Sequence, residues 1–149
     1  MTLAELHTKL KSNGIGEDQY FLHGLFGSTD DNDKIGLTIR QGQNGLEYET
    51  FYKERGEKHS IRTFTTEKEA CEHIFKKLID EQILYRIQKI VGLSGMTVNE
   101  RLWESGLMDE FDRAKKKDKT RAKEILRWLR VDEPSIQKIV KWRQKKKKR

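Results

Sequence analysis

The chain has 149 residues, of which 34% are hydrophobic and 37% charged, and a formal net charge of +7; this length suits one domain, or one domain with a small appended module. It contains neither an apolar run approaching the ~20 residues of a membrane span nor the apolar core of a secretory signal, and its single cysteine, Cys71, excludes an internal disulfide. Together these features predict a cytoplasmic protein with no membrane partner.

The first part of the chain has the periodicities of an α+β domain. Leucines at helical spacing predict a short helix at 2–12. Alternating or β-rich patterns predict four strands, at 19–27, 34–42, 46–56 and 60–64. Asn44-Gly45 is a strong hairpin signal between two of them. Because parallel crossovers need a dozen or more residues, these short connections predict a four-stranded antiparallel β-meander.

A long helix is predicted to pack on this sheet. Thr66 and Glu69 have the spacing of a capping box at its start. The apolar stripe behind them begins at Ala70 and predicts a helix over 67–91. Cys71 lies on this stripe, and we interpret it as a buried small hydrophobe and not as a nucleophile. The first domain is therefore expected to be an α+β domain of residues 1–91.

A C-terminal helical module is predicted over residues 96–142. Thr97 and Glu100 form a second capping box, and the helix that they start is expected to run through Gly106 to about residue 117, at some cost from the glycine. Asp118 and Asp132 are candidate N-caps for two further helices.

The positive charge is concentrated at the end of the chain. The stretch KWRQKKKKR (141–149) contains seven basic and no acidic side chains, whereas the other 140 residues contain 24 of each. Terminal blocks of like charge are usually disordered, so residues 143–149 are expected to form a basic disordered tail. Such a tail binds nucleic acid weakly and without sequence preference, and Trp142 beside it could stack on a base. A nucleic-acid-binding protein is therefore one alternative function.

Signals of enzymatic chemistry are missing from the sequence. It has no phosphate loop, dinucleotide-binding glycine pattern or serine elbow. The chain has four histidines, His7, His23, His59 and His73. They do not have the spacing of metal ligands, either with one another or with Cys71. We therefore expect no cofactor, no metal and no catalytic site. An uncharacterised enzyme that uses His59 with Glu54 is the second alternative.

The stretch TFYKERGEKHS (50–60) has an unusual density of aromatic and charged residues at a strand end. Glu54 and Arg55 are first interpreted as a fold-stabilising ion pair, and alternatively as part of an interface, for which tyrosine and arginine are favoured residue types. The longer stretch ETFYKERGEKHSIRTFTTEKEACEHIFKKL (49–78) resembles the core of small bacterial immunity proteins from contact-dependent and other polymorphic toxin systems. The matching residues are Tyr52, Glu54, Arg55, Gly56, Phe64, Glu67, Ala70 and Cys71.

A second resemblance points to the same class of protein. Residues 96–126 look like a helical segment found at the C-termini of many such small bacterial proteins. The two resemblances imply a non-enzymatic inhibitor that binds the C-terminal domain of a cognate toxin, a nuclease, in the cytoplasm. Inhibitors of nucleases are often acidic because they imitate the substrate, and the neutral body and basic tail of this chain argue against simple mimicry.

We expect the partner-binding surface on loops and exposed strand faces, because these elements tolerate the variation that discrimination among related toxins requires. An acidic loop at 30–33 and one face of the third strand supply its carboxylates, and the adjacent strand end supplies its tyrosines and arginine. The expected residues are Asp30, Asp31, Asp33, Glu47, Tyr48, Glu49, Tyr52, Glu54 and Arg55. For the acidic loop, a solvated turn is the alternative interpretation.

Overall fold

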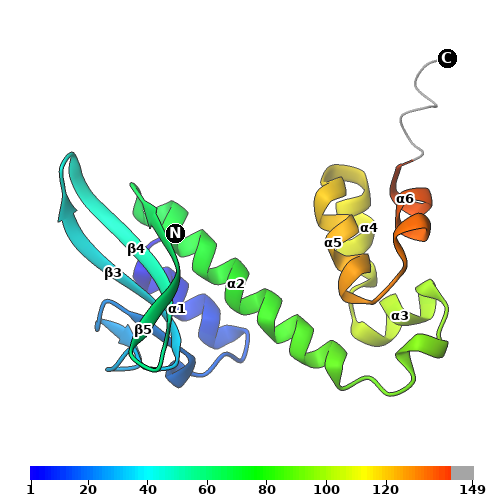
Figure 1. The fold of residues 1–149 in the computed structure, drawn as a ribbon, viewed down its shortest axis with the longest axis horizontal. Helices are drawn as coiled ribbons and strands as arrows, with labels where there is room; N and C mark the ends of the chain where they lie inside the picture. The colour runs from blue at the N-terminus through cyan, green and yellow to red at the C-terminus, as the bar shows by residue number, and fades with distance from the viewer. Residues whose placement is uncertain (142–149) are drawn as a thin grey trace, which may run out of the picture. The chain divides into compact units, whose positions relative to one another are not determined.

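The computed structural model describes residues 1–141 and confirms the α+β class. The predicted tail (143–149) and Trp142 lie outside the described residues. The elements run in the order α1 (Leu3–Ser12), η1 (Glu17–Gln19), β1 (Tyr20–Leu22), β2 (Phe26–Gly27), β3 (Lys34–Gly42), β4 (Gly45–Glu54), β5 (Glu57–Phe64), α2 (Glu67–Gln88), η2 (Leu93–Gly95), α3 (Val98–Ser105), α4 (Met108–Lys117), α5 (Lys119–Trp128) and α6 (Glu133–Lys141) (Figure 1).

The chain divides into two compact units, Met1–Asp80 and the residues from Glu81 onward. The division falls inside α2, so that this one helix contributes residues to both units. The domain boundary that the sequence suggests, between residues 91 and 96, lies after the helix. None of the helices within residues 1–141 combines the length and apolar character that crossing a bilayer requires.

The sheet has five strands in the order β2-β1-β3-β4-β5 and is mixed, so the predicted four-stranded antiparallel meander is wrong. The predicted strand at 19–27 breaks into β1 and β2 because His23 and Gly24 have positive φ angles of 55° and 75°. β2 then returns antiparallel to β1, and β3 lies parallel to β1 on its other side. The short segment 23–33 can join two parallel strands because β1 is brief and β2 itself reverses the chain.

Two hairpins complete the sheet. β3 and β4 pair as far as Gly42 and Gly45, which confirms the predicted hairpin; its loop consists of Gln43 and Asn44, and Gly45 is already the first residue of β4. The β4–β5 loop consists of Arg55 and Gly56, whose φ angles of 52° and 81° are both positive, as a type I′ turn requires. Within β5, Ser60 has a φ of 54° beside a register shift, and this bulge makes the edge strand a poor template for further pairing.

The core of the N-terminal unit lies between one face of the sheet and helices α1 and α2, which Figure 1 shows next to each other. Its buried residues come from all three components: Leu3, Leu6, Leu10, Ile15, Tyr20, Leu22, Ile35, Leu37, Ala70, Cys71, Ile74 and Leu78. The N–H of Glu69 donates to Thr66 Oγ1 at 3.2 Å, which places the start of α2 where the sequence predicts it. Glu67 Oε2 accepts from the N–H of Leu3 at 2.8 Å, so α2 also caps the start of α1.

The second unit is helical, and its caps follow the predicted positions. Thr97 and Glu100 form the capping box of α3, and Asp118 accepts from the N–H of Arg121 at the start of α5. The helix predicted to run through Gly106 is wrong, because Gly106 has a φ of 77° and ends α3 before α4 begins. A left-handed glycine at this position is a common helix stop.

One arginine joins the turns of the helical unit. The Arg101 guanidinium donates to four backbone carbonyls at 3.0 to 3.2 Å, those of Ser94, Met96, Leu129 and Arg130. Two of these carbonyls lie at the end of α5 and two lie in the segment before α3. A planar group with five donors suits this arrangement, which the three donors of a lysine could not reproduce.

Candidate partner-binding surface

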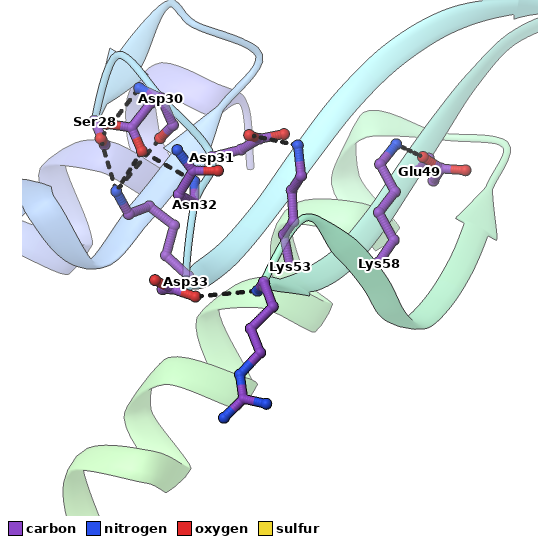
Figure 2. Close-up of polar contacts among 10 residues, drawn as sticks. Ser28, Asp30, Asp31, Asn32, Asp33, Glu49, Lys53 and Lys58 are labelled. Atoms are coloured by element: carbon purple, nitrogen blue, oxygen red, sulfur yellow. Dashed lines mark hydrogen bonds and ion pairs between the residues drawn. The ribbon is translucent and has the colours of Figure 1, made fainter.

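The acidic loop at 30–33 is shaped by its own side chains (Figure 2). Asp30 Oδ1 accepts from the N–H of Asn32 at 2.9 Å and from Lys34 Nζ at 3.2 Å. The hydrogen bond from Asn32 and then that from Lys34 lower the pKa of the Asp30 carboxyl below its usual value. Lys34 also donates to Ser28 Oγ at 3.0 Å. The loop therefore has a defined shape, while the Asp30 side chain is 57% exposed; a partner contact and a solvated turn are both compatible with this geometry.

Two contacts attach this loop to the end of the β4–β5 hairpin (Figure 2). Lys53 Nζ lies 3.1 Å from Asp31 Oδ1, and the N–H of Arg55 donates to Asp33 Oδ1 at 3.4 Å. Segments 22 residues apart in sequence thus form one surface. We call it the loop–turn surface and define it as residues 30–33 and 53–55.

Several groups of the loop–turn surface remain available to a partner. Asp33, Glu54 and Arg55 are exposed. Within residues 1–141 the Glu54 carboxylate and the Arg55 guanidinium have no ion pair, so the first interpretation of these two residues as an ion pair is not supported. Tyr52 lies beside this end of the sheet and is 38% exposed.

Glu47 and Glu49 belong to a separate network on the sheet face opposite the helices. Glu49 is only 7% exposed; its carboxylate lies 3.2 Å from Arg40 Nη1 and 2.8 Å from Lys58 Nζ. Glu47 lies 3.2 Å from Arg40 Nε. Because both carboxylates already have cationic partners within the sheet, they are less available to another protein than an unpaired carboxylate.

Phe51 lies on the same face and explains why Lys58 is held there. The Lys58 ammonium lies 4.4 Å from the centroid of the Phe51 ring. Gly36 on β3 is the residue opposite Phe51, and a Cβ atom at Gly36 would lie 2.6 Å from the Phe51 ring. The missing side chain of this glycine therefore makes room for the Phe51 ring, which is buried on the sheet face opposite α1 and α2.

Tyr48, unlike the other predicted site residues, packs against the hydrophobic core. It is partly buried on the helix side of the sheet. The residues that sequence reasoning missed are the cations Arg40, Lys53 and Lys58, which pair with the predicted carboxylates. The pairing of Arg40 with Glu47 follows from hairpin register, and could have been found by counting outward from the loop.

The alternative sites have little geometric support in the described part of the chain. Glu54 and His59 are both exposed on the β4–β5 hairpin, and no contact joins them. Cys71 is fully buried, and burial raises the pKa of its thiol to about 11, as expected of a structural cysteine. In residues 1–141, no three His, Cys, Asp or Glu side chains converge as metal ligands do.

Comparisons of this chain with protein-family models, with curated proteins and with solved structures found no match.

Proposed function

We propose that this protein is an immunity protein that binds the C-terminal domain of a cognate bacterial toxin, a nuclease, and neutralises it through a protein–protein complex in the cytoplasm. The observation that carries the proposal is the attachment of the acidic loop to the β4–β5 turn by the contacts of Asp31 with Lys53 and of Asp33 with Arg55. A surface held in shape before binding loses less conformational entropy when a partner docks.

The free charges of this surface fit a basic partner. Glu54 has no cationic partner among the described residues, and Asp33 accepts only one long hydrogen bond, from a backbone N–H. Nuclease domains present cations to bind phosphates, so exposed carboxylates at a defined spacing steer such a partner and give specificity. Tyr52 and Arg55, which are exposed beside these carboxylates, are of the residue types that dominate the free energy of binding in interfaces.

The test requires the cognate toxin domain, which is to be sought in the reading frames next to the gene of this protein. Co-expression with this protein is expected to restore growth of cells that produce the toxin domain, and the two proteins are expected to co-purify. If growth is not restored and no complex forms, the proposal is wrong.

A charge reversal then tests the surface itself. We expect Glu54→Lys to raise the Kd for the toxin domain by at least ~10-fold, since it places a cation opposite a basic partner. The matched control is Glu72→Lys, which reverses an exposed carboxylate on α2 and is expected to leave the Kd unchanged. Equal affinities of the two variants, measured by calorimetry, would place the interface elsewhere.

Nucleic-acid binding is the second candidate, favoured by the distribution of charge. Residues 1–80 contain 11 basic and 14 acidic side chains, which gives −3, whereas residues 81–141 contain 14 and 10, which gives +4. The remaining residues, 142–149, add six cations and no acid. A basic half of this kind attracts polyanions.

An enzyme is the third alternative, and it predicts a catalytic turnover that is lost when His59 or Glu54 is replaced.

A further inference from the structure

The helical unit has an apolar groove along α3 that its own fold leaves open. The groove has a volume of about 570 Å³. Its lining residues are Gly95, Met96, Asn99, Glu100, Trp103, Glu104 and Met108. Trp103 is 74% exposed, although tryptophan is highly buried on average. An exposed indole flanked by two methionines is typical of a surface that binds another segment.

The groove is acidic. Its lining includes two carboxylates and no cation. Glu100 Oε1 accepts from the N–H of Thr97 in the capping box, whereas Glu104 has no ion pair or hydrogen bond within residues 1–141. Arg101 forms no ion pair with Glu104, because its guanidinium donates to backbone carbonyls instead. The groove therefore presents an aromatic face beside unneutralised negative charge, which is the chemistry that attracts a cation to an indole.

The chain itself contains a segment with the complementary chemistry. Residues 142–149 read WRQKKKKR and supply one tryptophan, six cations and no acid. They follow directly after α6, which ends at Lys141. Ile139 of α6 lines a second hollow of about 360 Å³, which shares Asn99 and Met108 with the groove. Eight residues can extend over roughly 27 Å, so a segment of this length attached to the end of α6 is long enough to reach the groove.

We propose that the α3 groove is the docking site of the chain's own residues 142–149. Trp142 enters the apolar part between Met96 and Met108, and the following cations lie over the Trp103 indole and beside Glu104. Because the segment is covalently attached, its effective concentration at the groove is in the millimolar range, and weak contacts are sufficient. The sequence alone predicts a solvated tail, since the acidic groove is visible only in the fold of the described residues.

The test compares the full chain with a chain that ends at Lys141, by nuclear magnetic resonance of the Trp103 indole N–H. We expect this resonance to differ between the two proteins, and addition of the synthetic peptide 142–149 to the shortened chain to shift it toward its position in the full chain. Glu104→Lys in the full chain is expected to shift it toward the position in the shortened chain, as is high salt, which screens the attraction. Glu54→Lys, on the loop–turn surface, is the matched control and is expected to have no effect.

Two outcomes would overturn the inference. If the Trp103 indole and the methyl groups of Met96 and Met108 keep their resonances when residues 142–149 are removed, the groove is empty in the full chain. If the shift depends on protein concentration, the segment docks on a second copy of the chain and not on its own groove. Both outcomes leave the proposed binding of a toxin domain unaffected, because that interaction is assigned to a different surface.

Discussion

At the scale of single residues, the sheet contains a buried hydroxyl without a partner. Thr50 is 1% exposed, and its Oγ1 has no hydrogen bond within residues 1–141. An unsatisfied buried polar group costs free energy that an apolar group of the same shape does not. We expect Thr50→Val to leave the free energy of unfolding unchanged or to raise it by about 1 kcal/mol, as measured by urea denaturation.

Thr63 provides the control for this substitution, since it is exposed on β5. Thr63→Val is expected to change the stability by less than about 0.5 kcal/mol. A loss of more than about 1 kcal/mol in Thr50→Val would show that the buried hydroxyl has a stabilising partner.

The ionisation of His73 makes stability depend on pH. Burial, followed by the nearby cations Arg62, Lys77 and Lys76, lowers the pKa of this imidazole below 6.5 in the folded chain. The unfolded chain therefore binds a proton at His73 more readily, and this residue's contribution to the free energy of unfolding falls as the pH drops through 6.5 and below. We expect the free energy of unfolding to decrease less on acidification in His73→Gln than in the parent, as measured by denaturation at a series of pH values. Identical pH profiles would contradict this account.

The residue scale also shows what the sequence could predict about the site. The acidic loop was expected near the strand end, and the contacts of Asp31 and Asp33 place it there. Lys58 was not predicted as a cationic partner, because its pairing with Glu49 depends on the exact register of β4 and β5. That register is shifted by the bulge at Ser60, and a shift of this kind leaves little trace in the periodicity of a short, exposed strand.

At the scale of elements, Gly106 separates α3 from α4 by its left-handed conformation. A side chain at a φ of 77° is strained, and we expect Gly106→Ala to lower the free energy of unfolding by about 1 kcal/mol. Gly95→Ala is the matched control, because Gly95 lacks a positive φ and has open space around its Cα. If both substitutions have the same effect on thermal unfolding, the conformation of Gly106 does not limit stability.

Helices were predicted better than strands, for a physical reason. The helix starts at Thr66, Thr97, Asp118 and Asp132 depend on caps that act over three residues, so the local sequence contains the signal. The split between β1 and β2 depends on His23, where a non-glycine residue has a positive φ. His23 is held there by tertiary contacts: its N–H donates to the Leu37 carbonyl at 2.7 Å, and its Nδ1 accepts from the N–H of Ile39 at 3.0 Å. Contacts across the sheet cannot be seen in the sequence of one strand.

At the scale of the whole molecule, the uneven distribution of charge predicts how the chain behaves toward nucleic acid. We expect weak binding to RNA and DNA that is independent of sequence, decreases steeply with salt and is lost near physiological ionic strength. Deleting residues 142–149 removes six cations and is expected to reduce the slope of log K against log salt. Sub-micromolar, sequence-selective binding that survives the deletion would favour the nucleic-acid-binding alternative.

The position of α2 has a consequence for how the protein forms during translation. Ala70, Cys71 and Ile74 of this helix are buried in the first core, whereas Ile83 and Ile87, also buried, belong to the second unit. A ribosome that adds 5–20 residues per second needs roughly 3–14 s to make the 68 residues after Glu81. During that interval the first core can already be complete while two isoleucines of its own helix still face water. A nascent chain stalled at this stage therefore exposes apolar surface that the finished protein buries.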